Sequence, residues 1–511
     1  MPPAKRSIAG YGTALAVLLV AALAPAYATA ASLRAGVGVE SITSDSPTKP
    51  IHDPLLAKAL VVDDGKTRAL LVCLDLIGAS EPLTAAVRRQ VEEEVKIAQS
   101  NILVNASHNH HTNGQVAGDV VPRIVRAVHR AVDNMAPVKA GAGAGREDRI
   151  TINRRLRMKD GTHWTIRRAT PSPKDAAVAE LGPLDPEIGI LRLDRMDGTP
   201  LVVVYNFACH AYGGVPGGEV TADLPGFASR VIEEAWPGAT AMFLQGAAGD
   251  VTPIRYKDFD APAPTEQLGV RLGLSTLHAA HGLSLTQEAT VRVEGEVLDL
   301  PRRTDVQARI DSLLAQQEEI LQFFTGLGCG THGAGTPLSF KSFLPLYMKH
   351  FADPEHPAYA SYLYEFEAAT GQAGLEELDA ANRKRIDNYL ECIGRMEKLI
   401  VIRTNLQMFQ QRLNEAGAGP LRAEIQGMRI GSFVLVTFPG EPFAEVGLRI
   451  KKQSPLPYTF VAGYSNGSVG YAPTADAYDK EAYEDALAQL APEWQESYET
   501  KALQLIRRLA D

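Results

Sequence analysis

Histidines gather at one point of the sequence, directly after an apolar run. The segment Ser107-His108-Asn109-His110-His111 follows residues 102–106, and that apolar run predicts a buried strand. On an extended segment, residues two apart point to the same side, so His108 and His110 can reach one site at the end of the strand. α/β proteins gather their ligands at the carboxyl ends of strands. The pattern therefore predicts a functional site.

Two more strand ends carry groups of the same kind. His210 follows the apolar run 201–208, and Glu441 lies in the turn after 433–438. Two imidazoles and one carboxylate form a ligand set found in catalytic zinc sites, which keep one coordination position open for water. The positions of His108, His210 and Glu441 therefore predict a Zn²⁺ site.

These motifs resemble those of the neutral (non-lysosomal) ceramidases and their broader bacterial relatives. The resemblance runs discontinuously from Gly36 to Tyr483. Its densest segments are SHNHHTNG at 107–114, INRR at 152–155, NFACHAYGG at 206–214, ADLPGFA at 222–228, FLQGAAGDVTP at 243–253, FPGEPF at 438–443 and NGSVGYAPTADAY at 466–478. The combination is specific, although no single segment is.

The resemblance implies a zinc-dependent hydrolase that cleaves the amide bond of a ceramide-like N-acyl lipid. The family's zinc ligands fall on His108, His210, Glu441 and Tyr471. The groups that line its catalytic centre fall on His110, which would move the proton, and on Arg154 and Tyr483, which would hydrogen-bond the oxyanion. Tyr471 enters through the resemblance alone, because its spacing does not single it out.

The sequence departs from the family pattern at three places. Thr252 stands where the family has a serine, and His111-Thr112-Asn113-Gly114 replaces the usual Ser-Gly-Pro after the H-x-H pair. Ceramidases also carry a C-terminal immunoglobulin-like domain, whereas this sequence ends soon after Tyr483 with two expected helices, about 480–490 and 493–509. We therefore expect the catalytic fold without that domain. The substrate stays open between ceramide, another N-acyl amide and an ester.

Two other functions compete with this reading. A metallo-β-lactamase-like dinuclear hydrolase also begins with a strand and an H-x-H motif, but its Asp-His pair does not follow His110 here. A non-catalytic exported binding protein on the same fold would explain Thr252, although it would not need all four expected ligands. A metal count and a hydrolysis screen separate the three.

Composition and periodicity indicate the fold class. The chain has 511 residues with 51 Lys and Arg, 60 Asp and Glu and a net charge of −9, which excludes a basic nucleic-acid binder. Apolar runs alternate with amphipathic stretches over 33–300, which predicts an α/β (α+β) fold of mixed sheets flanked by helices. A Gln/Glu/Arg-rich helical insertion is expected at about 301–416, and we expect the strands at 424–438 and 458–462 to complete the sheet. We treat 29–511 as one catalytic domain.

The first 28 residues predict a signal peptide. Lys5 and Arg6 precede an apolar run at 14–23, and small residues that fit a cleavage site follow Pro25. The mature protein is therefore expected to be secreted or periplasmic, where Cys329 and Cys392 could form a disulfide. The expected partner is a small-molecule or lipid substrate, with no nucleic acid. A lipid substrate allows a peripheral contact with a membrane surface, and the oligomeric state stays open.

Overall fold

The structure is a computed structural model. It describes residues 1, 4, 32–166, 173, 175–253, 264–326, 340–352, 361–371, 374–415, 419–478 and 482–511. The expected signal peptide therefore lies outside the described residues, apart from residues 1 and 4. Among the described residues, no helix is both long enough and apolar enough to span a bilayer.

A large mixed sheet carries most of the site. Its eight strands lie in the order β12-β11-β10-β5-β1-β2-β3-β4. Their bounds are β1 Arg34–Ser41, β2 Leu56–Asp63, β3 Arg68–Leu74, β4 Ile102–Ala106, β5 Ala136–Arg146, β10 Glu187–Arg195, β11 Pro200–Phe207 and β12 Thr240–Gln245. The β3–β4 and β11–β12 pairs are parallel and the others antiparallel. The predicted α/β class is therefore correct.

Helices cover one face of this sheet. They are α1 Glu81–Val95, α2 Val120–Asp133, α3 Asp223–Ala235 and α4 Thr265–His281. The first two pack on β1 to β4, where α2 lies against β1 and β2, and the other two pack on β10 to β12. Alternate residues of each strand face these helices, as the period of a strand requires. In β3, for example, Leu70 and Val72 face helices while Leu71 and Cys73 face the opposite side.

The strands after the insertion form a second sheet, so the expectation that they complete the first one is wrong. The four strands are β14 Val291–Leu300, β15 Leu421–Ile430, β16 Phe433–Thr437 and β18 Tyr458–Ala462. One face, with Phe433 and Leu435, packs on the large sheet. The other face, with Val434 and Val436, packs under α11 Trp494–Ala510 and α9 Ala444–Gln453. Such strands are apolar on both faces, and sequence does not show which sheet a strand joins.

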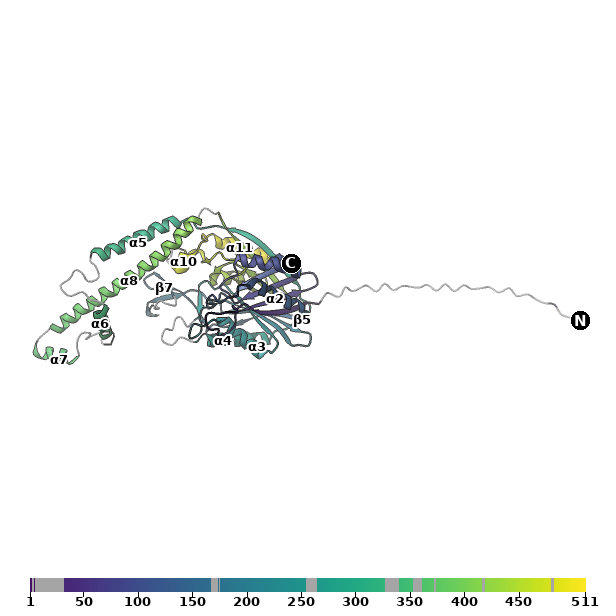
Figure 1. The fold of residues 1–511 in the computed structure, drawn as a ribbon, viewed down its shortest axis with the longest axis horizontal. Helices are drawn as coiled ribbons and strands as arrows, with labels where there is room; N and C mark the ends of the chain where they lie inside the picture. The colour runs from purple at the N-terminus through teal and green to yellow at the C-terminus, as the bar shows by residue number, and fades with distance from the viewer. Residues whose placement is uncertain are drawn as a thin grey trace.

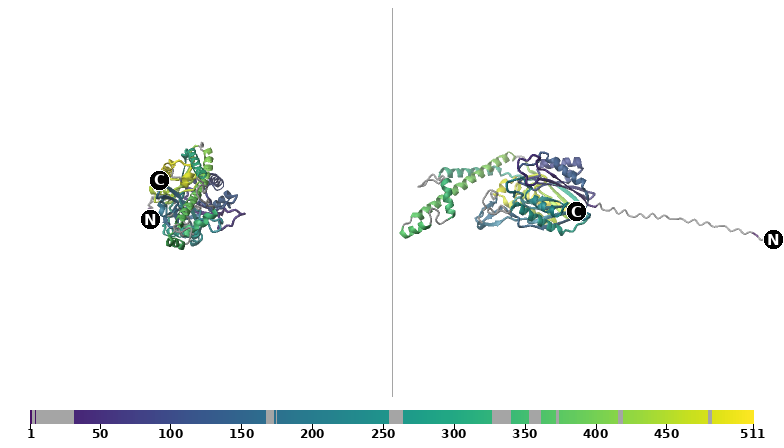
Figure 2. Two further views of the ribbon diagram at one scale, coloured as in Figure 1. Left: turned by 90° about the vertical axis from the view of Figure 1, so that its left-hand side faces the viewer. Right: turned by 60° about the horizontal axis from the view of Figure 1, so that its bottom comes forward.

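Four helices form an arm between β14 and β15. The two strands pair antiparallel, with Leu300 opposite Leu421, so the arm begins and ends at neighbouring points. Its helices are α5 Val306–Gly326, α6 Phe340–Ala352, α7 Ser361–Thr370 and α8 Gly374–Glu415. Figure 1 shows the arm projecting from the body, with α6 and α7 at its far end. The arm leaves the body on the side that carries α10 Tyr483–Leu487 and β7 Arg155–Met158, and Figure 2 agrees.

Short strand pairs hold the loops between these layers. β6 Thr151–Asn153 pairs with β13 Val251–Pro253, and β17 Glu441–Pro442 pairs with β19 Tyr471–Ala472. β7 lies between β8 His163–Thr165 and β9 Val178–Leu181. These pairs bring together segments that are far apart in sequence. Cys73 and Cys209 are free, Cys392 is disulfide-bonded, and Cys329 lies outside the described residues.

The packing of α2 on β1 predicts a sharp cost for one methyl group. A Cβ added at Gly38 would lie 1.9 Å from Ala127 O and 2.8 Å from Ala131 N. We expect Gly38→Ala to lower the free energy of unfolding by about 2–3 kcal/mol, because backbone atoms must move. Gly282→Ala is the control, since no atom lies within 4 Å of its added Cβ. Equal urea midpoints for the two variants would contradict this packing.

Candidate metal centre

The loop after β4 carries its histidines in a tighter conformation than expected. The sequence predicts an extended segment, but His108 has a left-handed backbone with φ of 59°, and His110 lies in a turn. A left-handed backbone is uncommon for a residue with a Cβ and persists where surrounding contacts enforce it. The two side chains still meet: His110 Nε2 lies 3.0 Å from His108 Nε2. The expected convergence is therefore correct, although its geometric reason is not.

Backbone carbonyls fix two of the imidazoles. His108 Nδ1 lies 2.8 Å from Ile77 O, and His210 Nδ1 lies 2.7 Å from Ala248 O and 3.0 Å from Val251 O. A carbonyl can only accept, so both rings must carry their proton on Nδ1. Their Nε2 lone pairs then point into the site, the arrangement that second-shell carbonyls give to metal-binding histidines. His210 Nε2 is buried and has no hydrogen-bond partner among the described residues.

Four of the predicted groups converge. His108, His110 and His210 offer nitrogens that all lie within 4.8 Å of one another. Glu441 Oε2 lies 3.4 Å from His108 Nε2 and 3.5 Å from His210 Nε2. Within the described part of the chain, this is the single group of three or more such side chains close enough to share an ion.

The imidazoles are held neutral. Burial lowers the pKa of His108 and lowers that of His210 well below the ordinary value. His110 is the most exposed of the three rings. Burial is still the largest cause that lowers its pKa, and the neighbouring imidazoles of His108 and His210 lower it further. Neutral imidazole is the form that binds a metal ion. The cluster therefore presents lone pairs without prior loss of protons.

A buried arginine organises the second half of the site. Arg154 donates from Nε to Glu484 Oε1 at 2.7 Å, and from Nη2 to Gly249 O at 2.7 Å and Tyr471 Oη at 3.1 Å. Its guanidinium carbon lies 5.9 Å from the centroid of the Tyr483 ring. Burial alone would lower the pKa of Arg154, but Tyr471 and Glu484 raise it well above its usual value. Arg154 is therefore a permanent positive charge beside both tyrosines.

The expected fourth ligand, Tyr471, lies next to Glu441. The two residues are opposite each other in the β17–β19 pair. The Tyr471 ring is edge-on to that of Tyr483, with centroids 5.8 Å apart. Burial raises the pKa of Tyr471, while Arg154 opposes that shift. Thr252, the remaining predicted residue, lies on β13, and its Oγ1 is buried without a hydrogen-bond partner among the described residues.

Sequence analysis missed three residues that shape the site. Glu484 is fully buried and also accepts from Arg155 at 3.2 Å, so it holds two arginines. Tyr464 donates to Glu441 Oε2 at 3.4 Å, and its ring centroid lies 4.2 Å from that of His108. Tyr212 flanks His110 and His210, with ring centroids 5.5 Å from each. Tyr212 lies inside the segment 206–214, Tyr464 lies two residues before the segment 466–478, and Glu484 directly follows Tyr483. These positions were the only signal in the sequence that pointed to the three residues.

The departure at His111 has a structural role. His111 Nδ1 lies 2.8 Å from Asp223 Oδ2, and both residues are buried. The Asp223 carboxylate also accepts from Gly213 N and Gly214 N. The pair thus ties the loop after β4 to the loop that follows His210. The replaced motif position braces the site rather than entering it.

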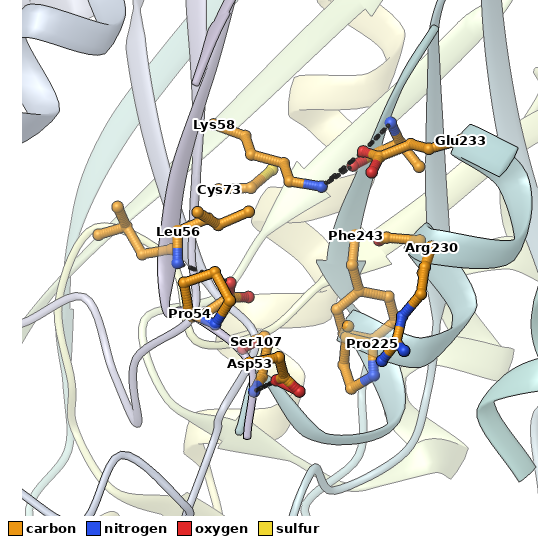
Figure 3. Close-up of a pocket in the computed structure, with 16 residues that line it drawn as sticks. Asp53, Pro54, Leu56, Lys58, Cys73, Ser107, Pro225, Arg230, Glu233 and Phe243 are labelled. Atoms are coloured by element: carbon orange, nitrogen blue, oxygen red, sulfur yellow. Dashed lines mark hydrogen bonds and ion pairs between the residues drawn. The ribbon is translucent and has the colours of Figure 1, made fainter. Parts of the chain in front are cut away.

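A cavity of about 210 Å³ lies beside the loop after β4, between β2, β3, β12 and α3. Figure 3 shows Lys58 reaching across it to Glu233, with 2.9 Å between the charged atoms. The cluster residues do not line it, but Ser107, next to His108 in the chain, does. Asp75 also lines it and accepts from Leu56 N at 2.9 Å. Burial raises the pKa of Asp75 to about 7, although Lys58 opposes the shift.

The comparisons with known proteins place the chain among relatives of the neutral ceramidases. The chain is 23% identical over 493 residues to the neutral ceramidase of Mycobacterium tuberculosis, covering 86% of this chain and 69% of that relative. The resemblance to the neutral ceramidases is confirmed. No family model matches the chain.

Solved ceramidase structures share the fold. A ceramidase complexed with C2 matches with a TM-score of 0.60 and 18% identity, covering 94% of this chain and 75% of that one. The neutral ceramidase of Pseudomonas aeruginosa matches with a TM-score of 0.58 and 18% identity, covering 93% and 75%. The ceramidase-like architecture therefore extends over nearly the whole chain.

Metal analysis tests the cluster. We expect about one zinc ion per chain, and loss of it in His108→Ala and His210→Ala, because each removes an oriented lone pair. Tyr205→Phe is the control, since its hydroxyl bonds to Pro225 O and Ser229 inside the core and away from the cluster. Elemental analysis that finds full zinc in the double histidine variant would contradict the assignment. His110→Ala decides whether that ring is a ligand: lost zinc makes it one, and retained zinc leaves it as a proton carrier.

Asp75 predicts a pH dependence of stability. Between about pH 4 and 7 the folded state keeps the proton on Asp75 that the unfolded chain has released, so Asp75 contributes a fall in the free energy of unfolding as pH rises through this range. We expect Asp75→Asn to lose this contribution and to gain stability relative to wild type at pH 8, by about 2 kcal/mol after allowance for partial exposure. Urea unfolding at several pH values measures it. Asp148→Asn, at an exposed position, should keep the wild-type slope; a wild-type slope in Asp75→Asn would contradict the assignment.

Proposed function

We propose that this chain is a zinc-dependent amidohydrolase that cleaves the amide bond of a ceramide-like N-acyl lipid. The observation that carries the proposal is the convergence of His108, His210 and Glu441 with the Arg154 network, at positions that resemble the neutral ceramidases. The proposed metal dependence rests on the oriented lone pairs of His108 and His210. The proposed lipid amide substrate rests on the relatives, which are named as ceramidases.

The donor set fits zinc. His108 and His210 would bind through Nε2, and Glu441 would bind through a carboxylate oxygen, with Tyr471 as the fourth ligand. Imidazole and carboxylate in a buried site suit Zn²⁺ well. When bound, the ion supplies Lewis acidity toward a carbonyl oxygen and an ionised water near neutral pH. The single cluster among the described residues favours one ion over the two of a dinuclear hydrolase.

The chain's own residues supply proton transfer. His110 has its Nε2 at the cluster and is the more exposed of the three rings, so it can take a proton from water at the site and pass it to the leaving amine. Its neutral state is the form that a general base requires. The same ring would serve as the general acid once protonated, and the products are a carboxylic acid and an amine.

Arg154 and Tyr483 would stabilise negative charge on the carbonyl oxygen. Glu484 and Gly249 hold the guanidinium in place, so its donors do not have to reorganise during the reaction. A fixed donor at a developing oxyanion contributes about 3–4 kcal/mol. Tyr483 begins α10 and lies against the Tyr471 ring, which places its side chain beside the expected ligands.

Export belongs to the proposal as well. The basic and apolar pattern of residues 1–28 supports a cleaved signal peptide and a secreted or periplasmic enzyme. Such a location would give the enzyme access to lipids outside the cytoplasm. N-terminal sequencing of exported material, starting between Thr29 and Ser32, would support it.

Kinetics on a verified N-acyl lipid test the roles. We expect Arg154→Ala and Tyr483→Phe to lower kcat by roughly 10²–10³-fold and His110→Ala by roughly 10²–10⁴-fold. For Arg154 and Tyr483, zinc content should stay near that of wild type, because neither residue is an expected ligand. Arg157→Ala is the matched control, since that arginine pairs with Glu180 at the exposed surface. Full activity in Arg154→Ala and Tyr483→Phe would contradict the assigned roles. A zinc-loaded wild type that hydrolyses no ceramide, N-acyl amino acid or ester would favour a binding protein.

A further inference from the structure

The far end of the arm exposes large apolar side chains on one helix face. Leu344, Met348 and Phe351 in α6 are 44%, 56% and 76% exposed. They are spaced four and three residues apart, so they lie on one side of the helix. Phe366 in α7, at the same end of the arm, is 60% exposed. We call Leu344, Met348, Phe351 and Phe366 the arm tip.

The rest of α6 anchors the helix. Phe343 is buried, and its ring stacks on Tyr389 of α8 with centroids 4.2 Å apart. The exposed face is therefore not the side that packs on the arm. A helix held by one aromatic and presenting Leu, Met and Phe outward has the form of an interfacial helix.

Charge favours a lipid surface as the occupant. α6 contains Lys341 and Lys349 and no acidic residue, in a chain whose net charge is −9. Glu365 and Glu367 flank Phe366 in α7, so the local positive charge belongs to α6 alone. The side chain of Lys349 is exposed. Basic residues beside an apolar helix face attract anionic headgroups while the apolar side chains enter the acyl boundary.

A second copy of the chain fits the tip less well. The three exposed side chains of α6 offer on the order of 300 Å², whereas a stable interface buries about 800 Å² on each partner. A dimer would therefore have to extend along α8, where Met396, Ile400 and Val401 are 48%, 68% and 51% exposed, and its loss is accordingly one outcome of the test. A bilayer has no such minimum, because each inserted side chain adds to binding separately, so α6 alone is enough for a lipid surface.

The base of the arm is joined to the site. Arg303, just before α5, donates to the buried carboxylate of Asp485 at 2.9 Å, and Arg309 in α5 lies 3.3 Å from it. Arg412 in α8 donates to Leu487 O. All three contacts end on α10, which begins at Tyr483. The arm also leaves the body on the side of α10 and β7 (Figure 1).

We propose that the arm tip docks on the surface of a lipid bilayer that contains anionic lipid, through Leu344, Met348 and Phe351 with Lys349 beside them. The proposal deepens the proposed function by assigning the surface that meets a membrane-held substrate. It rests on that function only for the lipid nature of the substrate.

Vesicle binding tests the proposal without turnover. The probe is phosphatidylcholine vesicles, with and without a minor fraction of phosphatidylglycerol and with no N-acyl lipid, and the readout is co-sedimentation of the full-length mature protein. We expect binding that increases with phosphatidylglycerol. The variant with Leu344→Ser, Met348→Ser and Phe351→Ser should bind at least tenfold more weakly, a lower bound, because the burial of three large apolar side chains contributes more than a tenfold change in affinity.

Matched variants make the test specific. The control combines Met196→Ser, Leu274→Ser and Val297→Ser, which are 44%, 55% and 49% exposed on the body, and it should bind like wild type. Lys349→Glu should lose the gain from phosphatidylglycerol, while Lys66→Glu in the β2–β3 turn should keep it. Zinc content and circular dichroism should be unchanged in all variants.

Three results would overturn the proposal. They are no binding of wild type to either vesicle, equal binding by the tip and control variants, and a wild-type dimer in solution that the tip variant abolishes. Because the vesicles contain no hydrolysable amide, failure of the proposed chemistry leaves this result intact. Hydrolysis of an N-acyl lipid without vesicle binding would likewise refute lipid docking by the arm tip, while it would support the proposed hydrolase activity.

Discussion

The site depends on the backbone carbonyls that hold the Nδ1 protons of His108 and His210. Each ring then has one orientation and one tautomer, and both Nε2 lone pairs face a common point near Glu441. Without the carbonyls of Ile77 and Ala248, either ring could rotate or place its proton on the other nitrogen. The loops that supply them are therefore as necessary to the chemistry as the histidines.

One of those loops, at Ala248, is held by a second set of buried charges, because Arg154 donates to Gly249 O. Glu484 is fully buried and would be costly to desolvate alone, but Arg154 and Arg155 both donate to it. Asp485, next in the chain, meets Arg303 on the side of the arm. Two adjacent carboxylates on one short helix thus connect the site on one side and the arm on the other. Removal of Glu484 would take the carboxylate partner from the buried Arg154, whereas Arg303 would keep its ion pair with Asp305.

Sequence reasoning reached the parts of the fold that have local signals. The strand Ile102–Ala106 has the predicted bounds, because an apolar run is visible within one segment. His108, His210 and Glu441 were predicted from their strand-end positions. Sheet membership was not, since strands buried on both faces read alike whichever sheet they join.

Long-range pairing explains the site residues that were missed or borrowed. Tyr471 was available only through the resemblance, because its place beside Glu441 is set by a two-residue strand pair that no local pattern encodes. Glu484 gives no local signal either, since its partner Arg154 is 330 residues away in the sequence. The left-handed backbone of His108 was also invisible, because a residue with a Cβ adopts it only when the surrounding fold imposes it.

The departure at His111 concerns the loops rather than the cluster. His111 pairs with Asp223, and that pair holds two loops together through Gly213 and Gly214. The residue at this position therefore braces the loops, while His108 and His110 keep their convergence. In the proposed enzyme, the ligand set would determine which bond can be activated, and loop bracing would set the shape of the approach to the site. A change of brace can thus alter the choice of substrate without a change in the cluster.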